Sequence, residues 1–123
     1  MKKLELDKLS DDELIVSFSA ASKEMGSAIL NSEMRRANKT FRYMEEIDHV
    51  LRSRGKDARL KLEPLLDDQD RFVRYYAAEY LLGLVPHRAR SVLEWNAKCA
   101  GDALAGDASM TLHNLDTGVY KPD

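Results

Sequence analysis

Histidine and cysteine are the side chains of this sequence that could hold a metal ion. The chain has three histidines and one cysteine, at His49, His87, His113 and Cys99. The histidines lie far apart in the sequence and Cys99 has no C-x-x-C partner, whereas a zinc site needs three or four converging ligands. We therefore expect no metal and no cofactor, and we expect Cys99 to be a small core residue.

The carboxylates have simpler uses than catalysis. Paired carboxylates occur at three places in the sequence. The pair at 11–12 favours a helix N-terminus, and the pair at 45–46 can form ion pairs with residues one helical turn away. The pair at 67–68 belongs to the loop between two predicted helices. No G-x-S-x-G motif and no glycine-rich phosphate loop is present. We expect no enzymatic activity, although a concave pocket with convergent titratable groups would argue for one.

Four basic residues gather on one predicted helix. Arg35, Lys39 and Arg42 stand at i, i+4 and i+7, which places them on one helix face, and Arg36 lies beside them. This face could contact the phosphates of a nucleic acid or an acidic protein. The alternative is a solvated surface opposite the apolar side of the helix.

A second cluster combines arginine and tyrosine, the residues that are enriched at interface hot spots. Tyr76 and Tyr80 fall toward the predicted apolar side of their helix, whereas Tyr75 points away from it. We therefore predict Tyr75, Arg71 and Arg74 as exposed contacts with a partner. The alternative is that these residues belong to the core or stand alone on the surface.

The elements that carry these residues are all predicted to be helices. Apolar residues recur at spacings of three and four, and no segment shows the alternation typical of strands. Ser10 and Glu13 form a capping box, Gly55 stands where a helix should end, and Pro64 should bend or end its helix. The expected helices follow Ser10 to about residue 30, then span about 33–54, 57–66, a segment after the loop 67–70, a segment near Pro86, and 109–115. We expect Trp95 to pack under the last of them.

Length and composition limit the possible functions. The 123 residues predict a single domain over 1–123, with loosely ordered ends at 1–9 and 117–123. No apolar stretch is long enough for a membrane span or a signal peptide, and one cysteine suits a reducing compartment, so we expect a cytoplasmic protein.

Charge is balanced overall but uneven along the chain. The 19 Lys+Arg and 21 Asp+Glu leave a net charge of −2, which disfavours a general nucleic-acid binder. Residues 31–61 hold nine Lys+Arg and five Asp+Glu, whereas residues 91–123 hold two and five, respectively. Patches of opposite sign could therefore select one partner or meet in a symmetric dimer.

The segment from Leu62 to Gly83 resembles a HEAT repeat. It has an apolar stretch, an Asp68-Gln69-Asp70 turn, and then Val73-Arg74-x-x-Ala77-Ala78-x-x-Leu81. The resemblance implies that Asp70 caps the second helix, that the two alanines let backbones approach, and that Arg74 reaches the aspartates of the turn or of a neighbouring repeat.

The wider chain resembles a small bacterial family of HEAT-like proteins known only as a domain of unknown function, number 2019 in that series. The residues that carry the resemblance are Leu9-Ser10-x-x-Glu13-Leu14, Gly106-Asp107-Ala108, Leu115-Asp116-x-Gly118 and Lys121-Pro122. It implies an all-α fold, a short HEAT/armadillo-like α-α superhelix of about five or six helices, and it brings no activity with it.

These observations predict a non-enzymatic protein–protein interaction module with an unidentified protein partner. One version is an immunity-type inhibitor of a partner toxin. The alternative is a nucleic-acid-binding protein that uses Arg35, Arg36, Lys39 and Arg42. A homodimer is compatible with each, since a short helical stack exposes apolar residues at its ends, here with Ile15, Leu30 and Val119 as contributors.

Overall fold

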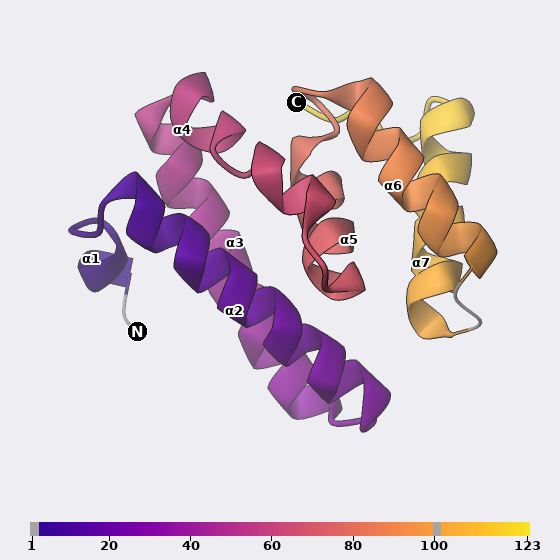
Figure 1. The fold of residues 1–123 in the computed structure, drawn as a ribbon, viewed down its shortest axis with the longest axis horizontal. Helices are drawn as coiled ribbons and strands as arrows, with labels where there is room; N and C mark the ends of the chain where they lie inside the picture. The colour runs from indigo at the N-terminus through magenta and orange to yellow at the C-terminus, as the bar shows by residue number, and fades with distance from the viewer. Residues whose placement is uncertain (1–2, 100–101) are drawn as a thin grey trace. The chain divides into compact units, whose positions relative to one another are not determined.

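The computed structural model describes residues 3–99 and 102–123, and their regular secondary structure is entirely helical (Figure 1). Two α-helices, α1 and α4, and the 3-10 helix η1 have only four or five residues. The longer helices are α2 (Asp11–Leu30), α3 (Met34–Arg54), α5 (Arg71–Leu81), α6 (Pro86–Cys99) and α7 (Ala103–Asp116). This confirms the predicted all-α class with five or six helices.

The chain divides into two compact units, Met1–Pro64 and Leu65–Asp123. The expectation of a single domain stays a prediction. In the first unit, α2 and α3 pack together. The capping box is present: the Ser10 hydroxyl accepts from the Glu13 amide, and the Glu13 carboxylate accepts from the Ser10 amide, both at 3.1 Å. The predicted core face of α2 is buried throughout, at Leu14, Phe18, Ala21, Met25 and Ala28.

The C-terminal end of α3 lies where Gly55 predicted it. Helix α3 ends at Gly55, whose φ of 111° suits glycine. The guanidinium of Arg54 donates to the Asp11 carboxylate at 2.8 Å and to the Asp7 carbonyl at 3.0 Å, which ties the end of α3 to the start of α2. Helix α1 (Lys3–Leu6) packs against α3 and buries Leu6 completely, in a segment where we expected a loosely ordered end.

The helix predicted over 57–66 is interrupted, as Pro64 requires. Helix α4 (Lys56–Leu60) stops before the proline, and Pro64 then lies in the first turn of η1 (Glu63–Asp67). Proline fits there because a first-turn amide has no helical partner, whereas inside an α-helix it would remove a hydrogen bond. The predicted bend or early ending is confirmed.

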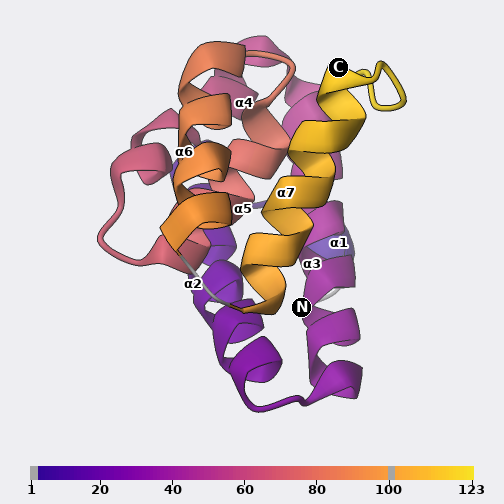
Figure 2. The ribbon, with the colours of Figure 1, turned by 90° about the vertical axis from the view of Figure 1, so that its right-hand side faces the viewer.

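The second unit contains α5, α6 and α7, in which α6 packs against both other helices. Helices α6 and α7 run antiparallel, side by side (Figure 2). The predicted start of the last helix at residue 109 is wrong, because α7 begins at Ala103. Asp102 caps it by accepting from the Ala105 amide at 3.2 Å, and burial of Leu104 and Ala108 stabilises the first turns despite Gly106.

Candidate functional site

The basic stripe, defined as Arg35, Lys39 and Arg42, lies exposed on α3 as the spacing predicted. Within the part of the chain that the structure describes, no carboxylate lies within ion-pair distance of any of the three. Their charges are therefore available to a partner, which distinguishes the stripe from most arginines of the molecule.

Arg36 differs from its neighbours because its charge is already used. Its guanidinium contacts the Glu24 carboxylate of α2 at 2.5 Å and the Glu33 carboxylate at 3.2 Å. The hydrogen bond from Arg36 lowers the pKa of Glu24, and the same bond raises the pKa of Arg36. Arg36 therefore joins α2 to α3, and its role as a partner contact stays a prediction.

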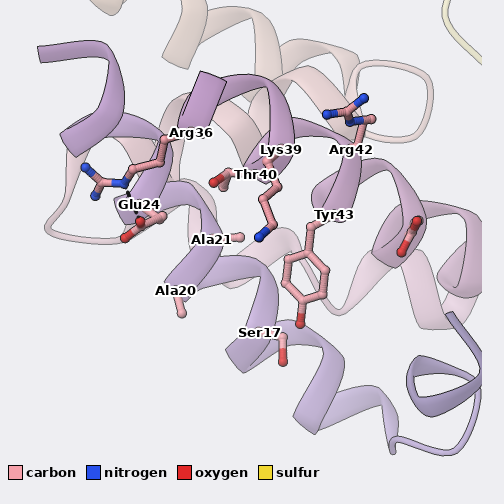
Figure 3. Close-up of a pocket in the computed structure, with 10 residues that line it drawn as sticks. Ser17, Ala20, Ala21, Glu24, Arg36, Lys39, Thr40, Arg42 and Tyr43 are labelled. Atoms are coloured by element: carbon pink, nitrogen blue, oxygen red, sulfur yellow. Dashed lines mark hydrogen bonds and ion pairs between the residues drawn. The ribbon is translucent and has the colours of Figure 1, made fainter. Parts of the chain in front are cut away.

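A groove of about 730 Å³ runs between α2 and α3 beside the basic stripe (Figure 3). Small residues of α2, Ser17, Ala20 and Ala21, form one wall, and α3 supplies Lys39, Thr40, Arg42 and Tyr43. Figure 3 shows Lys39 and Tyr43 directed toward the α2 wall, whereas Arg42 extends away from Tyr43. Glu24 and Glu46 complete the lining.

A second hollow of about 500 Å³ lies at the start of α3 and is lined by Glu33, Met34, Arg35, Arg36 and Lys39. Arg36 and Lys39 line both hollows, whereas Arg42 lines only the groove and Arg35 only the second hollow. Sequence spacing identified the cations but not the groove, since the α2 wall comes from a segment about twenty residues away.

The prediction that Tyr75 is an exposed contact is wrong, because its side chain is only 5% exposed. Its ring lies edge-on to that of Tyr76 with centroids 4.9 Å apart, and its hydroxyl bonds with the Glu79 carboxylate. Burial raises the pKa of Tyr75. A single apolar face was assumed for α5, whereas this helix is buried on more than one side, and the Tyr75 side carries a polar contact with α7.

A half-buried polar cluster that sequence reasoning missed joins α5 to α7. The Thr111 hydroxyl donates to the Glu79 carboxylate at 2.8 Å, and the Tyr75 hydroxyl donates to the same group. Burial raises the pKa of Glu79 above its ordinary value, and burial also raises the pKa of nearby Asp107. The four-residue spacing of Tyr75 and Glu79, which places both on one side of the helix, was the available signal.

Arg71 and Arg74 take part in contacts within the second unit. Arg71 pairs with the Asp102 carboxylate and lies 4.5 Å over the Phe72 ring. Burial acts to raise the pKa of Asp102, but the hydrogen bonds from Arg71 and the Ala105 amide lower it overall. The side chains of Arg71 and Asp102 are each only about one-quarter exposed. Arg71 therefore holds α7 against α5 instead of standing on an open surface.

Arg74 binds the turn before its helix, but through backbone rather than carboxylate groups. Its guanidinium donates to the carbonyls of Asp68 at 2.7 Å and Gln69 at 3.1 Å, and lies 5.1 Å over the Trp95 ring. The prediction that Trp95 packs under the last helix is wrong, since 46% of it is exposed. Leu93 and Asn96 are the inward residues of this part of α6, which directs Trp95 outward.

Among the described residues, no three His, Cys, Asp or Glu side chains lie close enough together to hold a metal ion. The Cys99 side chain, predicted to be a core residue, lies outside what the structure describes. Within the same described part, the helices are too short or too polar to cross a bilayer.

Comparison with known proteins covers almost the whole chain. The model of the family described as "Domain of unknown function (DUF2019)" matches residues 12–116. The chain is also similar to the crystal structure of the protein RPA1889 from Rhodopseudomonas palustris CGA009, with 33% sequence identity and a TM-score of 0.89 over 96% of this chain and 98% of that one. No curated protein matches it. The predicted family is therefore confirmed: the chain belongs to the DUF2019 family, a domain of unknown function.

Proposed function

We propose that this protein is a non-enzymatic protein-binding module built on a short HEAT-like helical stack. The observation that carries the proposal is the α2–α3 groove, which is lined by Lys39 and Arg42, two unpaired cations of the basic stripe. Its volume lies in the range typical of binding sites, and its polar groups are lysine, arginine and hydroxyls rather than a nucleophile with a base.

Three features of α5 and the turn before it support the HEAT-like part of this proposal. Asp70 caps α5 by accepting from the amides of Phe72 at 2.8 Å and Val73 at 3.2 Å. Ala77 and Ala78 are fully buried, which allows close packing of α5. Arg74 binds the carbonyls of the preceding turn. Helical repeat proteins bind partners through the extended surfaces that such stacks leave exposed.

The polar cluster of α5 and α7 does not favour an enzyme. The Glu79 carboxylate is occupied by the hydroxyls of Thr111 and Tyr75, and Tyr75 is almost fully buried. A substrate would have to displace these contacts to reach the carboxylate. The cluster therefore fits a structural role, and the exposed groove fits binding.

Affinity capture from the cells of the source organism tests the proposed function. The full chain, expressed with an affinity tag and crosslinked in the cells, should retain one protein in near-stoichiometric amount, and nuclease treatment should not release it. The double variant Lys39→Gln/Arg42→Gln should lose this protein. The matched control Lys23→Gln, which changes an exposed cation of α2 outside the groove, should keep it. Recovery of nothing above the tag alone would contradict the proposal.

Nucleic-acid binding is the second candidate, and the unpaired basic stripe is the observation that favours it. Because Arg36 is paired, about three phosphates would be neutralised, which predicts that log K falls with log salt with a slope of about −2.7 for a duplex. Fluorescence anisotropy with labelled duplex and single-stranded DNA measures this slope. Absence of binding to both at low salt would end this candidate.

A further inference from the structure

The two walls of the α2–α3 groove differ in a way that suits an extended chain. The α2 wall is low because it is built from Ser17, Ala20 and Ala21, so a ligand can approach the helix closely. The α3 wall supplies the cations Lys39 and Arg42. Figure 3 shows the hydroxyls of Thr40, Tyr43 and Ser17 distributed along the groove. Hydroxyls both donate and accept, as the amides and carbonyls of a peptide backbone require.

The charges of the groove select an acidic ligand. Lys39 and Arg42 have no carboxylate partner among the described residues, so a carboxylate of the ligand would form charge-assisted hydrogen bonds with them without breaking an existing pair. Such bonds are roughly twice as strong as those between neutral groups. Arg36 offers no comparable site because Glu24 and Glu33 already neutralise it.

The spacing of the lining residues sets the length of the ligand. Along α3, the groove extends from Arg36, which is paired with Glu24, to Glu46. The ten helical steps from Arg36 to Glu46 span about 15 Å at 1.5 Å per residue. An extended peptide advances at most about 3.3–3.6 Å per residue, so the groove accommodates about four or five residues.

The same arrangement disfavours other anions. A nucleic acid carries one negative charge on every nucleotide and would meet the Glu46 carboxylate within the groove, whereas the Glu24 carboxylate is already paired with Arg36. A small anion such as phosphate needs converging donors, whereas Lys39 points toward α2 and Arg42 extends away from Tyr43 (Figure 3). A peptide avoids both problems, because it can carry carboxylates in its centre and neutral residues at its ends.

We infer that the α2–α3 groove binds an extended segment of a protein partner with one or two carboxylates opposite Lys39 and Arg42 and uncharged residues on either side. This inference rests on the proposed binding function and names the chemistry of the partner. It assigns recognition of the carboxylates to two side chains of α3, and contacts with the peptide backbone to the hydroxyls of the groove.

Selection from a display library of random eight-residue peptides on the intact chain tests the inference. The recovered peptides should be enriched in Asp and Glu at one or two central positions. Replacement of those residues by Asn or Gln should weaken binding at least tenfold, as measured by isothermal titration calorimetry. The protein variant Lys39→Gln/Arg42→Gln should produce a similar loss, and combining both changes should add little further loss if the groups contact each other.

Controls separate an effect on the groove from an effect on folding. Lys39 and Arg42 are exposed, so the double variant should keep the circular dichroism spectrum and melting temperature of the parent. Lys23→Gln removes one positive charge elsewhere on α2 and should bind the peptides as the parent does.

The remaining outcomes decide against the inference in different ways. Peptides that bind without acidic residues, or that ignore the Lys39→Gln/Arg42→Gln change, would overturn it and leave the proposed binding function intact. Binding of a twelve-nucleotide single strand that is lost in the same variant would assign the groove to nucleic acid. If the library produces no binder, the inference fails, and the proposed function fails with it only if capture from the host also recovers no protein.

Discussion

Arg36 and Lys39 are nearly neighbours on α3, yet the structure gives them different roles. The Arg36 guanidinium lies between Glu24 of α2 and Glu33, while the Lys39 side chain extends into the groove (Figure 3). Both residues looked equivalent in the basic pattern of the sequence. What separates them is the identity of the residue that faces them from α2.

This difference predicts opposite results for two similar substitutions. Arg36→Gln should lower the melting temperature because it breaks the link between α2 and α3, and the loss should shrink at high salt, which screens exposed pairs. Lys39→Gln should leave the melting temperature unchanged and weaken partner binding instead. Thermal unfolding at low and high salt measures both. Equal melting temperatures for the two variants at low salt would contradict the assigned roles.

Tyr75 belongs to the interior rather than to an interface, which leads to a second prediction. Tyr75→Phe keeps the buried ring but removes the hydroxyl that donates to Glu79. A hydrogen bond to a charged group contributes about 1.5–3 kcal/mol, so the free energy of unfolding should fall by about that amount. Urea denaturation provides the measurement. An unchanged midpoint together with weaker partner binding would restore Tyr75 as a contact residue.

The half-buried carboxylate of Glu79 predicts a pH dependence of stability. Burial raises its pKa in the folded state above the ordinary value, so the folded state binds more protons than the unfolded state between those two values. Stability is therefore lost as pH rises through this window, and Glu79→Gln should abolish that part of the loss.

Comparing the parent protein with the Glu79→Gln variant separates the titration of Glu79 from that of the other carboxylates. The pKa values of Asp11, Glu24 and Asp102 are lowered and that of Asp107 is raised, but these groups are present in both proteins. The stability of the parent relative to Glu79→Gln, measured by urea denaturation from pH 4 to pH 8, should thus decrease with pH. A constant difference across this range would show that Glu79 does not titrate as inferred.

At the scale of elements, the cap that starts α7 also makes a tertiary contact. Asp102 caps α7 through the Ala105 amide and pairs with Arg71 of α5. One side chain therefore both begins a helix and holds it to its neighbour. This contact helps to explain why α7 starts at Ala103, before the predicted start at residue 109.

Two substitutions at this position separate the roles of Asp102. Asp102→Asn keeps an efficient cap and loses the charge, whereas Asp102→Ala loses both. The alanine variant should be less stable than the asparagine variant by about 1 kcal/mol, the usual effect of a cap. Amide hydrogen exchange should show the extra loss in the first turn of α7. Equal stability of the two variants would mean that Asp102 acts only through Arg71.

At the scale of the whole molecule, contacts between distant segments decide which parts of the surface are open. Gly83, after α5, is one example within the second unit: a Cβ atom at this position would overlap the backbone of Asp123, about forty residues further along the chain. Glycine is needed here for close approach rather than for its backbone angles. The pattern around residue 83 gave no sign of this contact.

A substitution at Gly83 should therefore release the last residues from their position. In Gly83→Ala, the amides of residues 119–123 should shift in the NMR spectrum and exchange faster, while the amides of α2 and α3 keep their shifts. Gly106→Ala is the matched control, because a Cβ atom there meets nothing within 4 Å and alanine favours a helix. Unchanged signals for residues 119–123 in Gly83→Ala would contradict the packing.

Charge and apolar exposure are also properties of the whole chain. The net charge of −2 conceals a basic stripe that lies on a single helix of the first unit. Of the residues predicted to contribute to a homodimer, Leu30 and Val119 are exposed and Ile15 is half-buried. Homodimer formation and the HEAT-like stacking of the helices stay predictions.

The sequence by itself determined the local features of this protein. The all-α class, the capping box of Ser10 and Glu13, the end of α3 at Gly55 and the interruption at Pro64 all depend on residues within one or two helical turns, where spacing and backbone preference suffice. Family membership also followed from the sequence, because its motifs extend along most of the chain.

Only the tertiary structure decided which side chains are available. The period of a helix shows which residues share a face, but burial and pairing depend on what another helix places opposite that face. Arg36 is neutralised by Glu24 of α2, and Tyr75 is buried beside a cluster completed by Thr111 of α7. The groove beside Lys39 and Arg42 exists for the same reason: small residues of α2 lie opposite the cations of α3.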